Sequence, residues 1–136
     1  MRGWIGGAIL IALVFGGCSR DNTPKGVADR FVHAYYVQID QAQALEFTTA
    51  LARERLQREL QLVGPIRRGG GVEQARPQVE YNLVRTQPEG RQVLFVYDLT
   101  ITPMQVSPMV KKVLIITDQF AGQWKVINFA ETDATR

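Results

Sequence analysis

The chain has only one cysteine and one histidine among its 136 residues. A single cysteine excludes an intrachain disulfide framework and a metal cluster built from cysteines. A single histidine excludes the usual metal sites that use two or three histidines. Basic residues outnumber acidic residues by only three, 16 against 13, and this surplus is too small to indicate nucleic-acid binding. The composition therefore predicts neither a metal nor a cofactor, and no nucleic-acid partner.

The chain also lacks the length for several domains and the polar bias of a disordered protein. Its 136 residues have the size of one domain. Hydrophobic residues make up 46% of the chain and charged residues 21%, as in an ordinary globular protein. We therefore expect one folded core, and any indication of function has to come from local patterns.

The N-terminal segment is apolar and almost uncharged. Arg2 is the only charged residue before Arg20, and residues 4–17 form an uninterrupted apolar run. A bilayer core about 30 Å thick needs roughly 20 residues of helix, so this run is too short to span it well. A basic residue, an apolar stretch and then small residues form the pattern of a secretory signal. Residues 1–17 are therefore predicted to be a signal peptide.

The only cysteine follows this segment directly, in the sequence Phe15-Gly16-Gly17-Cys18. This sequence resembles the lipobox of bacterial lipoproteins, although Phe15 stands where that motif prefers leucine. The resemblance implies cleavage between Gly17 and Cys18, acylation of Cys18, and attachment of the exported chain to a lipid bilayer. Ser19 then implies the periplasmic face of the outer membrane, if the organism is Gram-negative. The alternatives are a free structural cysteine behind an ordinary signal peptide, or a retained, uncleaved anchor.

The mature chain begins with a tether and continues as a helical region. Residues 18–23 are predicted to hold the lipidated cysteine and a short polar tether. Thr23 and Pro24 are typical of a helix start, as N-cap and first helical residue. Apolar spacing near 3.6 residues predicts three helices, at 24–39, 41–46 and about 50–63. Asp40 is predicted to cap the second helix, and Gly64-Pro65 to end the third; a loop is expected at 66–77.

The second half of the chain changes to a period of two residues. Four strands are predicted, at 78–86, 91–102, 110–117 and 123–130. Their short connections favour a sequential antiparallel meander. We expect the domain to end near residue 131, with a frayed tail over 132–136.

Apolar side chains occupy both faces of the predicted strands. Leu94 and Val96 share a face with Asp98, although the opposite face of the same strand is also apolar. An antiparallel sheet with one wet face should alternate cleanly between apolar and polar residues. Either the second face meets another subunit, a partner or a ligand, or curvature of the sheet buries both sets within one domain.

This order of elements resembles the nuclear-transport-factor-2-like (NTF2-like, cystatin-like) α+β superfamily over residues 24–131. The segment 27–36, followed by Asp40 and by the alanine- and leucine-containing 42–45, is similar to its first two helices, and 124–129 to its last strand. The resemblance implies two to three helices on a curved four-stranded meander. It also implies a cone-shaped pocket and dimerisation through the sheet. A plainer α+β domain, with helices packed on one sheet face, is the alternative.

Enzymes of this superfamily place a carboxylate and a tyrosine or second acid inside the cone. The polar candidates in this chain are Tyr35, Asp40, Tyr97, Asp98 and Asn128. None matches a catalytic motif that can be transferred residue by residue, so the sequence predicts no enzyme. Tyr97, Asp98 and Asn128 form a tentative pocket. We expect Tyr35 to lie in the core, Asp40 to act as a cap, and Asp98 to be solvated.

Two other features are interpreted as solvated surface. His33 lies one helical turn from Asp29, which predicts a solvent-exposed pair. Met104 and Met109 flank a proline-containing turn and could form a small apolar tip.

Two functions remain open at this point. The first is a membrane-anchored lipoprotein whose domain is a non-catalytic binding or assembly module, pairing with a second copy or another protein through the sheet. The second is a small-ligand binding protein or enzyme that uses a cone-shaped pocket.

Overall fold

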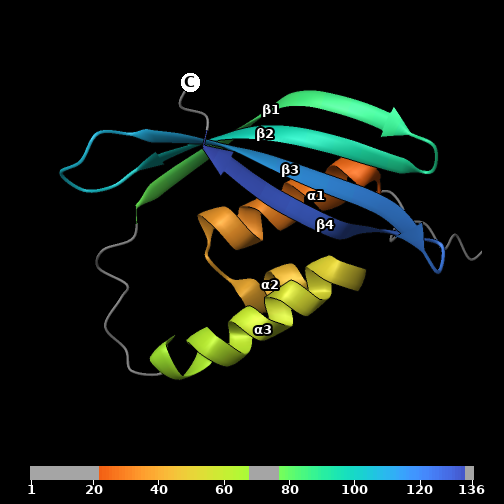
Figure 1. Ribbon diagram of the computed structural model, residues 1–136, viewed down its shortest axis with the longest axis horizontal. Coiled ribbons are helices and arrows are strands. Elements are labelled where there is room, and N and C mark those ends of the chain that lie inside the picture. The colour runs from red at the N-terminus through yellow and green to blue at the C-terminus, as the bar shows by residue number, and fades with distance from the viewer. Residues whose placement is uncertain (1–21, 68–76, 134–136) are drawn as a thin grey trace, which may run out of the picture.

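The computed structural model describes residues 22–67 and 77–133 (Figure 1). The predicted signal segment, Cys18 and most of the predicted loop lie outside the described residues. Within the described ranges, no helix is both long and apolar enough to cross a bilayer.

The helical region contains four elements: α1 (Pro24–Val32), the π-helix η1 (His33–Val37), α2 (Gln41–Leu45) and α3 (Ala50–Arg67). Both predicted caps are confirmed, since the Thr23 side chain accepts from the Gly26 N–H and the Asp40 side chain from the Gln43 N–H. The predicted end of the third helix is wrong, because α3 continues through Pro65 to Arg67. A proline in the last turn forfeits one backbone hydrogen bond, which a helix end tolerates better than its middle.

The helix predicted over 24–39 is interrupted by the wider turns of η1. The Gln38 N–H donates to the His33 carbonyl, five residues earlier, at 2.9 Å. Widening the turn changes which side chains face inward. Tyr36, which the regular helical period places on the polar side, therefore packs against the core beside Tyr35, with ring centroids 4.7 Å apart.

The sheet is an antiparallel meander in the order β1-β2-β3-β4, as predicted. Its strands are β1 (Gln78–Glu89), β2 (Gln92–Thr102), β3 (Met109–Phe120) and β4 (Gln123–Asp133). Strands β1, β3 and β4 are longer than predicted because their ends still find partners, whereas β2 has nearly the predicted bounds. In particular, Asp133 pairs with Lys111, so the sheet continues past residue 131, into the segment expected to fray.

A β-bulge explains why β4 carries apolar residues at both odd and even positions. The pairing with β3 passes from Asn128 to Val126 and skips Ile127. An extra residue in one strand shifts the alternation of its side chains by one position. Val126 and Phe129, three residues apart, are therefore both buried.

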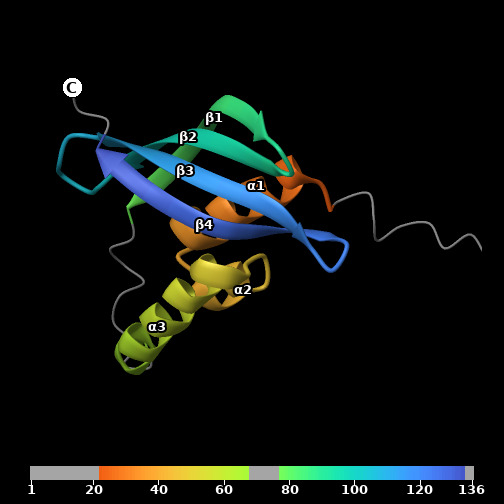
Figure 2. The same ribbon diagram turned by 45° about the vertical axis from the view of Figure 1, so that its right-hand side comes forward.

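The helices lie on one face of the curved sheet (Figures 1 and 2). Helix α1 packs on β2, β3 and β4, and α3 packs on β4. We call the helix-covered face the inner face and the opposite one the outer face. The buried core lies between the helices and the inner face; it consists of Val27, Ala28, Phe31, Val32, Ala34, Ala44, Ala52, Leu56, Phe95, Tyr97, Leu99, Val113, Ile115, Val126 and Phe129. The chain is thus an α+β protein with helices on a four-stranded meander, as predicted.

Candidate functional site

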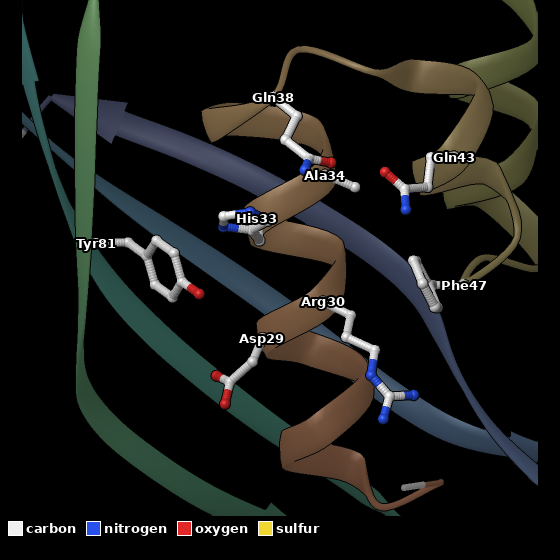
Figure 3. Close-up of a pocket in the computed structure, with 8 residues that line it drawn as sticks. All are labelled: Asp29, Arg30, His33, Ala34, Gln38, Gln43, Phe47 and Tyr81. Atoms are coloured by element: carbon white, nitrogen blue, oxygen red, sulfur yellow. The ribbon is translucent and has the colours of Figure 1, made fainter. Parts of the chain in front are cut away.

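A pocket of about 270 Å³ lies between the exposed side of α1, strand β1 and the region of α2 (Figure 3). Helix α1 contributes Asp29 and η1 contributes His33, while Tyr81 comes from β1. Gln43 of α2 and Phe47, just after α2, lie on the other side. These elements are far apart in the sequence, so only the folded chain brings the residues together.

The Asp29 carboxylate accepts two side-chain hydrogen bonds at the pocket. Its Oδ1 accepts a hydrogen bond of 2.5 Å from the hydroxyl of Tyr97, which is buried on the inner face. Its Oδ2 accepts from Lys25 Nζ at 2.7 Å. Burial, and then the hydrogen bond to Asp29, raise the pKa of Tyr97. Tyr97 therefore remains a neutral hydroxyl donor at physiological pH, held against the carboxylate.

The aromatic ring of Tyr81 lines the β1 side of the pocket. Tyr81 lies edge-on to His33 at a centroid distance of 6.2 Å and edge-on to Tyr97 at 6.1 Å. Figure 3 shows the Tyr81 ring directed toward α1, next to Asp29 and His33. The pocket thus combines an aromatic wall with hydrogen-bonding side chains, the usual composition of a small-molecule site. Its volume lies just below the range of about 300–1,000 Å³ that such sites occupy.

A resident metal has no set of ligands in the part of the chain that the structure describes. No group of three histidine, cysteine, aspartate or glutamate side chains comes together there. The chemistry available in the pocket is hydrogen bonding, aromatic contact and the opposite charges of Asp29 and Arg30.

The three residues of the tentative pocket are not brought together. Tyr97 points to the inner face, and Asp98, the next residue, points to the outer face because strand side chains alternate. There Asp98 Oδ1 accepts a hydrogen bond from Lys112 Nζ at 3.3 Å, as expected of a solvated carboxylate. Asn128 is exposed on β4, and its side chain accepts from the Phe129 N–H. Of these three, Tyr97 alone adjoins the observed pocket, through Asp29.

Sequence patterns could not have found the partner of Tyr97. Asp29 lies 68 residues earlier in the chain, and its helical position indicated only a solvent-facing residue beside His33. His33 itself is exposed, but both residues line the pocket. The one available signal was that Asp29 and His33 share a helix face.

Tyr35 belongs to a second polar network, between η1, α3 and β4. Its hydroxyl donates to the Glu59 carboxylate at 2.8 Å, and Arg55 Nε donates to the same carboxylate at 3.2 Å. Arg55 also donates to Glu131, at 3.1 Å, and its guanidinium lies 4.1 Å from the Phe129 ring centroid. This network ties α3 to the edge of the sheet and satisfies the half-buried Tyr35 hydroxyl.

The outer face of the sheet carries four adjacent apolar side chains. Leu94 pairs with Ile116 and Val96 with Leu114 across β2 and β3. We call these four residues the outer-face quartet. Each is half-buried, and none of the described helices lies over it (Figures 1 and 2). The quartet is bordered by the Asp98–Lys112 pair.

Comparison with known proteins gives a likeness in structure. No protein-family model matches the chain, and no curated protein matches it in sequence. A solved structure from Thiobacillus denitrificans, described as a calcium/calmodulin-dependent protein kinase type II association domain, matches with a TM-score of 0.56. The match covers 83% of this chain and 96% of that chain at 11% identity. This likeness shows that the chain has the NTF2-like fold predicted from its sequence.

Proposed function

We propose that the chain is an exported, membrane-anchored lipoprotein whose NTF2-like domain is a non-catalytic assembly module. The anchor is the acylated Cys18, exposed by cleavage after Gly17. Two or more acyl chains on one residue hold a protein stably at a bilayer, whereas one chain binds only marginally. The domain would face the periplasm or the cell surface; Ser19 favours the periplasmic side of the outer membrane in a Gram-negative organism.

The observation that carries the assembly role is the uncovered outer-face quartet. Four apolar side chains in register form a continuous patch, and such patches are typical of interaction surfaces. The occupant we propose is a second copy of this chain, packed sheet to sheet about a twofold axis. The similarity in fold to a protein described as an association domain supports this choice.

Light scattering of the mature chain tests the assembly. The chain carries Cys18→Ser, so that no acyl group or disulfide contributes. We expect twice the chain mass, and the single chain mass for Leu114→Arg, which puts an unpaired charge at the centre of the contact. Glu80→Arg, a charge change on the edge strand β1 away from the quartet, should leave the dimer intact. A monomeric parent protein, or a dimer that survives Leu114→Arg, would refute the proposal.

The anchor has a separate test in cells. Cys18→Ala removes the sulfur that receives the lipid, so we expect loss of lipid labelling and accumulation of the uncleaved precursor. Normal processing of Cys18→Ala would instead show an ordinary signal peptide.

A second candidate function, binding of a small polar molecule, is favoured by the pocket between α1 and β1. The Asp29 carboxylate, held by the buried Tyr97 hydroxyl, offers a fixed acceptor beside the Tyr81 ring. A screen of small amines and amino acids by thermal shift tests it. A true ligand should raise the melting temperature of the parent protein, and the rise should be lost in Asp29→Asn and Tyr81→Ala but kept in Asp98→Asn, on the outer face.

A further inference from the structure

The described chain begins at a point that is fixed to the sheet. The Asn22 side chain bonds both backbone groups of Trp124: its Oδ1 accepts from the N–H at 2.7 Å, and its Nδ2 donates to the carbonyl at 3.4 Å. Trp124 pairs with Gln119 across the β3–β4 hairpin. The chain therefore enters the domain beside the β3–β4 turn.

This entry point defines one end of the molecule. The start of α1 and the β1–β2 and β3–β4 turns lie at one end in both views, and the β2–β3 connection lies at the other (Figures 1 and 2). We call the first the tether end and the second the far end.

The tether leaves little distance between this end and a lipid on Cys18. Four peptide units separate Cys18 from Asn22, and a fully extended chain covers at most about 3.5 Å per residue. Asn22 therefore stays within about 14 Å of the acylated residue, less than the diameter of the domain. This step rests on the acylation of Cys18 proposed above.

The tether end carries an exposed aromatic side chain. Phe120, the last residue of β3, is 61% exposed although it is large and apolar. It pairs with Gln123, next to the residue that Asn22 holds. On this hairpin the charged residues balance, since Asp118 pairs in register with Lys125. Aromatic rings are favoured at the boundary between lipid and water, so this end fits a bilayer surface through apolar contact rather than net charge.

We infer that the tether end of the domain rests on the lipid bilayer, with Phe120 in the headgroup layer. The sheet then stands on end, and its outer face points sideways, where a second anchored copy can reach it. The far end, with the exposed Met104 and Val106, points away from the membrane. The short tether and the Asn22 clamp together fix this orientation.

Spin labels at the tips of two opposite turns test the orientation. Ala121 and Gln105 are both exposed turn residues with positive φ, 52° and 70°, so they form a matched pair. Each is replaced by cysteine in the full chain, labelled after acylation, and reconstituted in phosphatidylethanolamine–phosphatidylglycerol vesicles. We expect the relaxation ratio of dissolved oxygen to a water-soluble nickel chelate to be several-fold higher at 121 than at 105. Equal ratios, or a higher ratio at 105, overturn the inference.

Two further variants separate the causes. Asn22→Ala, which removes the clamp, should reduce the difference between the two labels, and Phe120→Ser should bring the 121 label into water. If neither variant alters the ratios, the clamp and Phe120 do not hold the domain in this orientation, and the inference fails. Mass spectrometry of each sample shows whether Cys18 is acylated. An unacylated Cys18 refutes both the anchor and the orientation, whereas an acylated chain with equal ratios refutes the orientation alone.

Discussion

Ile115 and Leu114 are neighbours in β3, yet they lie on opposite faces of the sheet. Ile115 is fully buried on the inner face, beneath the helices. Leu114 is half-buried on the outer face, next to Val96 of β2. The two faces thus carry similar apolar side chains, but the described helices cover only the inner face. None of them covers the outer face, which is where the proposed second copy would pack.

The largest expected effect is on the inner face. Ile115→Ala leaves a cavity among residues that cannot close around it, and should lower the free energy of unfolding by about 2–5 kcal/mol. Leu114→Ala removes a similar volume from a partly solvated site and should cost the dilute monomer less than about 1.5 kcal/mol. Urea unfolding at low protein concentration measures both. Equal losses would mean that the outer face is as fully packed as the inner face, and would break the comparison.

The second effect depends on protein concentration. If the outer face binds a second copy, dimerisation stabilises the folded chain by mass action, by about 2.7 kcal/mol when the partner is present at a hundred times Kd. The urea midpoint of the acyl-free parent protein should therefore rise with concentration. The midpoint of Leu114→Arg should stay constant, and Glu80→Arg should behave as the parent does. A parent midpoint that does not depend on concentration would leave the outer face without the proposed occupant.

The third effect concerns the hydrogen bond between Tyr97, on the inner face, and Asp29 of α1. Tyr97→Phe removes the hydroxyl that donates to Asp29, and loss of a hydrogen bond to a charged group should cost about 1.5 kcal/mol at neutral pH. It should also change the pH dependence of stability. Burial, and then hydrogen bonds to carboxylates, raise the pKa values of Tyr35, Tyr36 and Tyr97 above 10.

The sign of that pH dependence follows from the raised pKa values. Below about pH 10 these tyrosines are protonated in both states, and their contribution is complete. At higher pH the unfolded chain releases protons that the folded chain keeps, so the free energy of unfolding falls by about 1.4 kcal/mol per pH unit for each tyrosine. In Tyr97→Phe, the free energy of unfolding should fall less steeply with pH, by the contribution of one tyrosine. Urea titrations between pH 8 and 11.5 measure this slope. An unchanged slope of the free energy of unfolding against pH would show that folding does not raise the pKa of Tyr97.

Much of the fold could be predicted because its signals are local. Thr23 and Asp40 are caps that act within three residues, and the change of period from 3.6 to 2 separates helices from strands. The bulge at Ile127 and the π-helical turn at Tyr35 and Tyr36 were not predictable, since each inserts an extra residue into a regular period. Both departures explain apolar or aromatic side chains that a regular pattern would place on the wrong side.

The candidate site was harder to predict than the fold. Tyr97 was named as a pocket candidate, and it does lie on the inner face. Its partner Asp29 and its neighbour Tyr81, however, come from separate elements. Their meeting depends on how α1 crosses the sheet and on the register of β1 with β2, which places Tyr81 opposite Leu99. Local sequence spacing carries no information on either.

The smallest expected effect is in the β3–β4 turn, which fixes the strand register and so decides on which face each β4 side chain lies. Ala121 and Gly122 form a two-residue loop between the paired Phe120 and Gln123, and both have positive φ, 52° and 78°. Two-residue loops of this kind fix the strand register, and a slip of one residue would exchange the inner and outer side chains of β4. Alanine is strained at positive φ by about 1–2 kcal/mol, whereas glycine is not.

Ala121→Gly should therefore stabilise the domain by about 0.5–1 kcal/mol, because relief of strain exceeds the extra chain entropy that glycine loses on folding. Gly122→Ala should destabilise it by about 1 kcal/mol. No atom lies within 4 Å of an added Cβ at Gly122, so the loss would report backbone strain alone. Thermal unfolding of both variants measures these opposite signs. If both changes were neutral, the turn would not hold the register, and the assignment of β4 side chains to two faces would have to rest on the bulge at Ile127 instead.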